Sequence, residues 1–191
     1  MKNKLLLIVL LSVLCNSCTN IWMEDLVGHL IKKPDEPYAV LGETGPGGGV
    51  VFYDKGNSSD GWRYMEASKQ TNLGYGILWS TATGSINTSP FIGSGKNNTE
   101  LITAEYPGDT DNAAWKCKSY NGGGYNDWFL PSLDEFNELL SSDLGIFSYN
   151  EYWTSSQLSA NNAYYFTVIP PFANSAVKTS AAYSFLPVRR F

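Results

Sequence analysis

The segment that most constrains the fold runs from Tyr125 to Leu140 and carries a complete helix start signal. Pro131 restricts the residue before it to an extended backbone. Ser132 and Glu135 have the S-x-x-E spacing of a capping box, in which each side chain accepts a hydrogen bond from the backbone N–H of the other. The apolar residues that follow share one helical face: Leu133, Phe136, Leu139 and Leu140. The segment therefore predicts an amphipathic helix, beginning after Ser132, that packs on a core.

Residues 1–17 predict a secretory signal peptide instead of a part of the fold. Two lysines precede an apolar run, Leu5–Leu14, which is interrupted only by Ser12 and is too short to span a bilayer as a stable helix. Cys18 follows the small residue Ser17, as in the bacterial lipobox, where the cysteine is lipidated and becomes the mature N-terminus. We therefore expect a lipoprotein with its lipid on Cys18. The alternative is an ordinary secreted protein in which Cys18 is a free thiol.

The charge of the chain bears on its partners and location. Removal of residues 1–17 takes away two lysines and no acid, so the formal charge falls from −5 to −7. An acidic chain without a basic cluster argues against nucleic acid and against electrostatic binding to anionic lipid. Membrane attachment would then come from the acyl chains alone. We expect a place in the cell envelope, at the outer membrane or the cell surface.

After the signal peptide we expect a tether over residues 18–40 and one domain over residues 41–191. The tether contains two prolines that prevent regular structure, and it holds His29, the only histidine, which we interpret as a solvated residue. Cys117 is the only cysteine of the domain, so the fold depends on its core and not on a disulfide. About 150 residues are enough to bury such a core.

Two stretches resemble known ligand loops without completing them. Gly93–Thr99 lacks both the glycine and the Ser or Thr that a phosphate loop requires, so we interpret it as the start of a helix capped by Asn98. Asp109–Asn112 begins like a calcium loop, but alanines follow where ligands are needed. One of its last two residues is expected to cap a helix over Ala113–Tyr120. We expect no metal and no cofactor.

Motifs spread over Gly45–Phe191 together resemble one family. They are Gly48–Tyr53, Leu78–Ser80, Gly93–Thr99, Tyr125–Ser132, Tyr152–Ser156 and Val188–Phe191. In order and spacing they are similar to the Legionella collagen-like (Lcl) C-terminal domain family, which is related to the C-type-lectin-like fold of the formylglycine-generating enzymes. The resemblance implies a loop-rich α+β domain with small twisted antiparallel sheets and two or three helices. It also implies paired N- and C-terminal strands, which would place Val50–Tyr53 beside Val188–Phe191.

Two activities found in that fold do not carry over to this chain. Calcium-dependent sugar binding uses Glu-Pro-Asn or Gln-Pro-Asp together with Trp-Asn-Asp, and the domain contains neither set. The formylglycine-generating chemistry uses a cysteine pair, whereas Cys117 stands alone. The domain also lacks histidine, the commonest general base. We therefore expect a binding protein and not an enzyme, with a structural envelope lipoprotein as the alternative and a degenerate enzyme as the third reading.

The C-terminal composition suggests where a ligand binds. Leu158–Phe191 contains no Glu, Gln, Met or Trp and a single lysine, Lys178; codons ending in a pyrimidine encode none of these types. This resembles the variable region of lectin-fold proteins diversified by retroelements, and Tyr with Ser, Ala and Asn is typical of adaptable binding surfaces. A strand-and-loop region with few charges is the other interpretation.

We expect the ligand surface in the loops between Trp153 and Lys178, with Trp153 itself in the core. Aromatic faces supply buried area and amides supply specificity. The predicted ligand-binding residues are Tyr152, Asn161, Asn162, Tyr164, Phe172 and Asn174. The expected ligand is an extracellular protein or glycan, and the sequence does not decide between the two.

Overall fold

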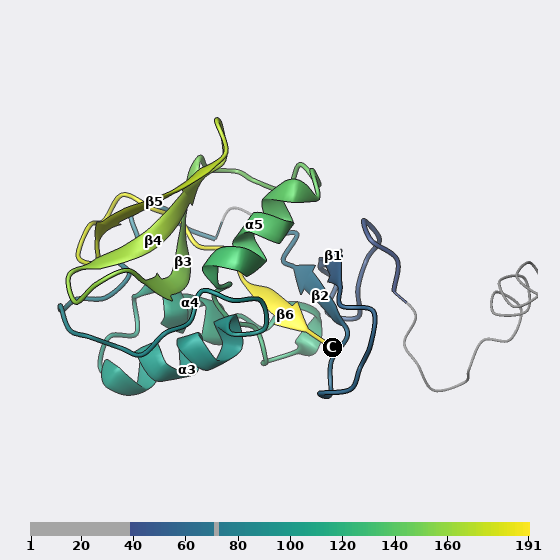
Figure 1. Cartoon of the computed structure of the whole chain (residues 1–191), viewed down its shortest axis with the longest axis horizontal. Helices are drawn as coiled ribbons and strands as arrows, with labels where there is room; N and C mark the ends of the chain where they lie inside the picture. Colours follow the sequence, from purple (N-terminus) through teal and green to yellow (C-terminus); the bar gives the residue numbers. More distant parts are fainter. Residues whose placement is uncertain (1–38, 71–72) are drawn as a thin grey trace, which may run out of the picture. The chain divides into compact units, whose positions relative to one another are not determined.

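The computed structural model describes residues 39–70 and 73–191 (Figure 1). The predicted signal peptide, the lipidation site Cys18, His29 and nearly all of the tether lie outside the described residues. Ala39–Phe191 forms a compact unit. Its elements in chain order are β1 (Val50–Asp54), β2 (Tyr64–Ala67), α3 (Gly95–Glu105), α4 (Ala113–Lys118), the 3-10 turn η1 (Gly122–Gly124), α5 (Leu133–Ser141), β3 (Glu151–Gln157), β4 (Asn162–Thr167), β5 (Phe172–Val177) and β6 (Val188–Arg190).

The unit is a mixed α+β structure, as predicted. It contains two three-stranded sheets with the orders β1-β2-β6 and β3-β4-β5, and all strand pairs are antiparallel. Of the described helices, none has the length and apolar character needed to cross a bilayer.

The first sheet brings the two ends of the unit together, but not through a direct strand pair. β2 pairs with β1 on one side and with β6 on the other, with Ala67 opposite Val188. The predicted pairing of Val50–Tyr53 with Val188–Phe191 is therefore wrong, because β2 separates these two strands. All four residues of β2 are buried, and a buried strand needs a hydrogen-bonded neighbour on each edge.

Helix α5 lies between the two sheets (Figure 1) and contacts β1, β3 and β4. Its predicted capping box is confirmed. The Ser132 hydroxyl accepts from the Glu135 N–H at 3.3 Å, and the Glu135 carboxylate accepts from the Ser132 N–H at 2.7 Å. Phe136 and Leu139 are fully buried, and the other two apolar residues of this face pack against the same cluster. The amphipathic pattern therefore sets the position of this helix between the sheets.

The second sheet contributes to two core clusters because neighbouring residues of a strand point to opposite faces. Tyr152 is paired with Phe166, and both pack with Phe136 of α5. Trp153 is paired with Tyr165 and packs in the other cluster, where it is fully buried, as predicted.

Two helix starts test the predicted caps. Helix α4 begins after Asn112, whose side-chain oxygen accepts from the Trp115 N–H at 2.8 Å, so that cap is confirmed. The prediction for Asn98 is wrong, because α3 begins at Gly95 and Asn98 lies inside it. The Asn98 amide is buried and bonds both backbone groups of Ser89, at 2.9 and 2.6 Å. It fixes a distant loop instead of capping its own helix.

Candidate ligand-binding site

A groove of about 440 Å³ lies between α5 and the hairpin formed by β4 and β5. Helix α5 supplies one wall, β4 supplies the floor, and the turn and the start of β5 supply the other wall. The lining residues are Leu133, Asp134, Asn137, Leu140, Ser141, Phe166, Pro171, Phe172 and Ala173. The groove therefore joins apolar surface from the two sides with a few polar groups on the helix.

The sequence provides the helix wall through simple periodicity. Asp134, Asn137 and Ser141 follow one another at spacings of three and four residues, which puts them on one side of a helix. That side faces away from the buried Phe136 and Leu139. Sequence reasoning used only the apolar face of this helix, so it missed these residues, although the polar spacing was available to find them.

The β4–β5 register distributes the predicted ligand residues over both faces of the sheet. Tyr164 is opposite Ser175, so it shares the face of Phe166, which forms the groove floor. Asn162 lies on the same face by alternation. Asn174 is opposite Tyr165, so it belongs to the other face. Phe172 lines the end of the groove, and Asn161 is exposed just before β4.

Tyr152 requires a correction, because it is fully buried and cannot meet a ligand. Its hydroxyl accepts from the backbone N–H groups of Ser148 and Tyr149, at 3.0 and 2.9 Å, and its ring packs on Phe136. The predicted loops between Trp153 and Lys178 are also mostly strand. Composition alone did not indicate β5, which forms by pairing with β4 along its whole length.

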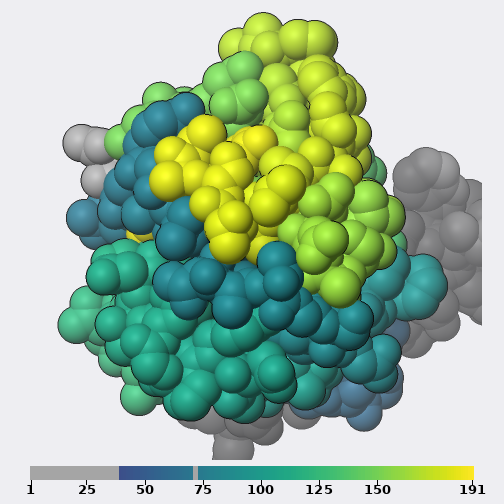
Figure 2. Space-filling view, turned by 90° about the vertical axis from the view of Figure 1, so that its left-hand side faces the viewer, coloured from purple at the N-terminus to yellow at the C-terminus, as the bar shows by residue number. Residues whose placement is uncertain are grey.

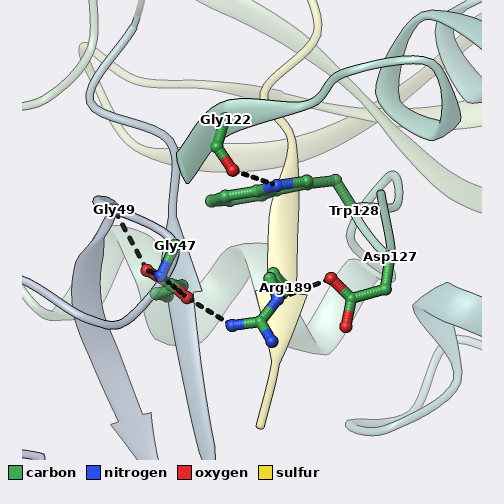
Figure 3. Close-up of polar contacts among 7 residues, drawn as sticks. Gly47, Gly49, Gly122, Asp127, Trp128 and Arg189 are labelled. Atoms are coloured by element: carbon green, nitrogen blue, oxygen red, sulfur yellow. Dashed lines mark hydrogen bonds and ion pairs between the residues drawn. The ribbon is translucent and has the colours of Figure 1, made fainter. Parts of the chain in front are cut away.

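A second polar cluster surrounds Glu66, and Figure 3 labels the residues around it, among them Gly47, Gly49, Asp127 and Arg189. The Glu66 carboxylate is fully buried and accepts from the N–H groups of Gly47 and Gly49, at 2.9 and 3.0 Å. Arg189 donates to it at 2.8 Å and also to Asp127 at 2.5 Å. A Cβ at Gly47 would lie 2.8 Å from atoms of both Glu66 and Trp128, so only glycine fits there. Both carboxylate oxygens are occupied, which makes this cluster a structural device and not a general base.

Lys178 forms a third buried polar site. Its ammonium group donates to the Gly84 carbonyl and to the Gln157 side chain, both at 2.6 Å, and lies 4.6 Å from the centre of a Trp79 ring. Burial lowers the pKa of Lys178 to about 8. Figure 2 shows atoms of the C-terminal chain, in yellow, next to blue atoms of the loop before α3. Ile77 of that loop forms a bridge with Tyr183. Lys178 is fully buried, so a substrate cannot reach its amine.

The groove, the Glu66 cluster and the Lys178 site differ in whether a ligand can reach them, and in the described part of the chain neither a metal site nor a free buried acid lies beside them. Within residues 39–70 and 73–191, no group of three or more His, Cys, Asp or Glu side chains could hold a metal ion. Burial raises the pKa of Glu135, whose carboxylate is already occupied by the backbone N–H groups of Ser132, Gly93 and Gly95. Of the three sites, the groove is the one that is open to a ligand, and it combines apolar and polar lining residues.

No protein-family model matches this chain, and no curated protein sequence matches it either. Its function is therefore inferred from the groove.

Proposed function

We propose that this protein is a non-enzymatic bacterial lipoprotein of the cell envelope that binds an extracellular protein or glycan. The ligand would occupy the groove between α5 and the β4–β5 hairpin, in a domain of the C-type-lectin-like fold. The observation that carries the proposal is the groove itself, in which Leu133, Leu140 and Phe166 lie beside Asp134 and Asn137. Binding sites combine an apolar lining with a few placed polar groups in this way.

The resemblance to the Lcl C-terminal domain family supports the fold part of the proposal, and Cys18 supports the anchor. A lipid on Cys18 would hold the domain at the outer membrane or the cell surface, where an adhesive function needs it. The proposal includes no nucleic acid, metal or cofactor.

The composition of the C-terminal region supports a changeable groove wall. The hairpin belongs to Leu158–Phe191, whereas the α5 wall lies outside that region. Phe185 and Leu186 of the same region are buried in the core. Diversification would therefore be confined to exposed positions such as Phe172 and Asn174, and a reverse transcriptase gene beside a near-repeat of this coding segment would support it.

Substitution of Phe172 tests the proposal. The full-length chain, purified in a mild detergent, is screened on a glycan array and on an array of extracellular proteins, and the affinity of each hit is then measured. Phe172→Ala should weaken binding by about tenfold or more, because Phe172 is an exposed aromatic residue at the end of the groove, and aromatic residues carry much of the affinity of binding surfaces. The melting temperature should stay the same, because Phe172 is 44% exposed.

Leu158→Ala is the matched control, since Leu158 is 49% exposed and does not line the groove. It should leave binding unchanged. An array hit that Phe172→Ala leaves unaffected would remove the groove from the proposal. Silence on both arrays would favour a structural envelope lipoprotein without a dedicated ligand.

A further inference from the structure

Strand β5 is an edge strand without the usual protection against pairing. Among the described strands it pairs only with β4, and its register continues without a bulge over all six residues. Its sequence, Phe-Ala-Asn-Ser-Ala-Val, contains neither a charge nor a proline, and four of the six residues are exposed. Proteins commonly protect edge strands with charged residues, prolines or bulges. β5 therefore has the properties of an edge that accepts another strand.

The direction of the backbone groups on β5 follows from a contact on the other side of β4. The Tyr164 carbonyl accepts from the Thr154 hydroxyl of β3 at 2.9 Å, so the backbone groups of Tyr164 point toward β3. Its partner on β5, Ser175, is then in a non-hydrogen-bonded pair. The N–H and C=O of Ser175 therefore point away from the sheet, and by alternation so do those of Ala173 and Val177.

Local groups already bond part of this outward edge. The Ser175 N–H donates to the side-chain oxygen of Asn174 at 2.8 Å, and the Val177 carbonyl accepts from the Ser180 N–H at 2.9 Å. The Asn174 amide thus supplies the acceptor that a neighbouring strand would otherwise supply. The carbonyl of an extended peptide can replace it without movement of the backbone.

The groove can be reached from this edge across a low wall. On the groove face, β5 presents Ala173 opposite Phe166 and Ser175 opposite Tyr164. Both side chains are small, and adjacent strands lie about 4.8 Å apart. A large side chain on an added strand, at the position beside Ala173, can therefore extend over the alanine toward Phe166 and Leu133. The open edge and the groove then form one continuous surface.

We infer that the ligand is an extended polypeptide segment that adds to β5 as a fourth strand and places an apolar side chain over Ala173 into the groove. This inference rests on the proposed function and names its class of ligand. The backbone groups of β5 select an extended chain, because only another backbone offers donors and acceptors at the strand repeat. Asp134 on the α5 wall favours a Lys or Arg two positions from the apolar residue, on the same face of the added strand.

Charge favours such a peptide over a second copy of this chain as the occupant of the β5 edge. The protein carries a formal charge of −5, so two copies repel each other. A second β5 would bring no cation toward Asp134, because its six residues are all neutral. The occupant is therefore a segment of a different protein that carries both apolar and basic residues.

The probe is a phage-displayed library of random twelve-residue peptides, panned on the full-length chain in detergent. The strongest peptide is synthesised, and its dissociation constant is measured by fluorescence polarisation. Ser175→Pro removes an N–H that points away from β4, so it blocks the added strand and leaves the β4–β5 pairing in place. It should weaken binding by about tenfold or more. Ser175→Ala, the matched control, keeps the N–H and should bind within about twofold of the original chain.

Ala173→Leu is a second variant, independent of any backbone change. It raises the low wall, so it should weaken the binding of peptides with a large apolar residue beside position 173 by about tenfold. The binding of peptides that carry alanine at that position should change little. Circular dichroism and the melting temperature establish that each variant is folded. If Ser175→Pro does not fold, Ala173→Leu alone decides the inference.

Three results would overturn the inference. Folded Ser175→Pro and Ala173→Leu that bind the selected peptide as well as the original chain would exclude strand addition, while the proposed function would stand. A library without binders, together with a glycan that needs Phe172, would identify a glycan ligand and also leave the proposed function standing. A dimer in sedimentation that Ser175→Pro separates and Ser175→Ala does not would show a second copy as the occupant.

Discussion

At the scale of single residues, Lys178 shows how one polar side chain can serve the core of a region with few charges. It is the only lysine of Leu158–Phe191, and no local pattern in the sequence indicates what surrounds it. The structure buries it completely and uses its ammonium group to join Gly84 to Gln157. The bonds connect the loop before α3 to the end of β3, at sequence separations of 94 and 21 residues.

Burial of Lys178 makes the stability of the protein depend on pH. Its pKa is about 8 in the folded protein and 10.5 in the unfolded chain. Between these values the unfolded chain binds more protons than the folded protein, so the free energy of unfolding rises with pH. The destabilisation is complete below pH 8 and disappears toward pH 10.5. Urea denaturation from pH 7 to 9.5 should show a rise of about 1–2 kcal/mol.

Lys178→Met is the control for this rise, because it removes the titrating group and fills similar space. The tyrosines also titrate in alkaline solution, but their contribution is common to both proteins and cancels in the difference. The difference in unfolding free energy between the two proteins should therefore change with pH. Parallel curves over the whole range would show that the Lys178 amine titrates as it does in the unfolded chain.

At the scale of elements, Glu135 couples the start of one helix to the start of another. It completes the capping box of α5, and the same carboxylate accepts from the N–H groups of Gly93 and Gly95, at 2.9 and 3.2 Å. A Cβ at Gly95 would lie 2.1 Å from the Glu135 carboxylate, so the glycine permits this approach. Helices α3 and α5 thus share one buried acceptor.

This double use predicts an unequal effect of two substitutions in the same capping box. Ser132→Ala removes one cap acceptor and should lower the free energy of unfolding by about 1 kcal/mol. Glu135→Gln turns an amide toward several backbone N–H groups and should cost about 2–3 kcal/mol, because buried donors lose their acceptor. Denaturation in urea at pH 7 gives both values. Asn137→Ala on the outer face of α5 is the control and should lower the free energy of unfolding by less than about 0.5 kcal/mol. Equal losses for Ser132→Ala and Glu135→Gln would contradict the coupling of the two helices.

The helices and strands differ in how far the sequence predicts them. The α5 cap, its apolar face and the α4 cap depend on residues within one or two turns, so local pattern was sufficient. Asn98 failed because a buried amide can bond a distant loop as well as its own helix, and only tertiary structure decides between them. The sequence did not predict β5, because its small polar residues have low intrinsic β-propensity. Pairing with β4 overrides this low propensity in the folded protein.

The candidate site shows the same limit. Phe172 was predicted from composition and lines the groove, whereas Tyr152 was predicted by the same reasoning and lies in the core. Composition identifies a region but not the face on which each residue falls. A strand alternates between two faces, so the register of the β4–β5 pair decides which residues meet a ligand. The α5 wall lies outside that region altogether.

At the scale of the whole unit, the ends of the chain segment from Ala39 to Phe191 are joined through a buried ion pair. Arg189 on β6 and Glu66 on β2 are 123 residues apart in sequence and 2.8 Å apart in the structure. The guanidinium group also lies 3.7 Å from the centre of the Tyr125 ring. Because Glu66 also binds the glycine-rich turn before β1, one carboxylate holds the beginning and the end of this unit together.

A double-mutant cycle on this pair tests how the unit is closed. Arg189→Met should lower the free energy of unfolding by about 3–5 kcal/mol, because it leaves the buried Glu66 carboxylate without its counter-charge. Glu66→Gln should cost less, because Arg189 keeps the Asp127 carboxylate as its partner. The double variant leaves no unpaired charge at positions 66 and 189, and Asp127 is partly exposed to water, so its loss should be smaller than the sum of the single losses by about 1–3 kcal/mol. Lys55→Ala at the partly exposed Lys55–Asp60 pair is the control and should cost less than about 1 kcal/mol. Additive losses at Glu66 and Arg189 would mean that the two side chains support the fold separately. A large coupling energy would instead show that the ion pair stabilises the β1-β2-β6 sheet as one unit. The pair links β6, through Glu66 on β2, to the turn before β1.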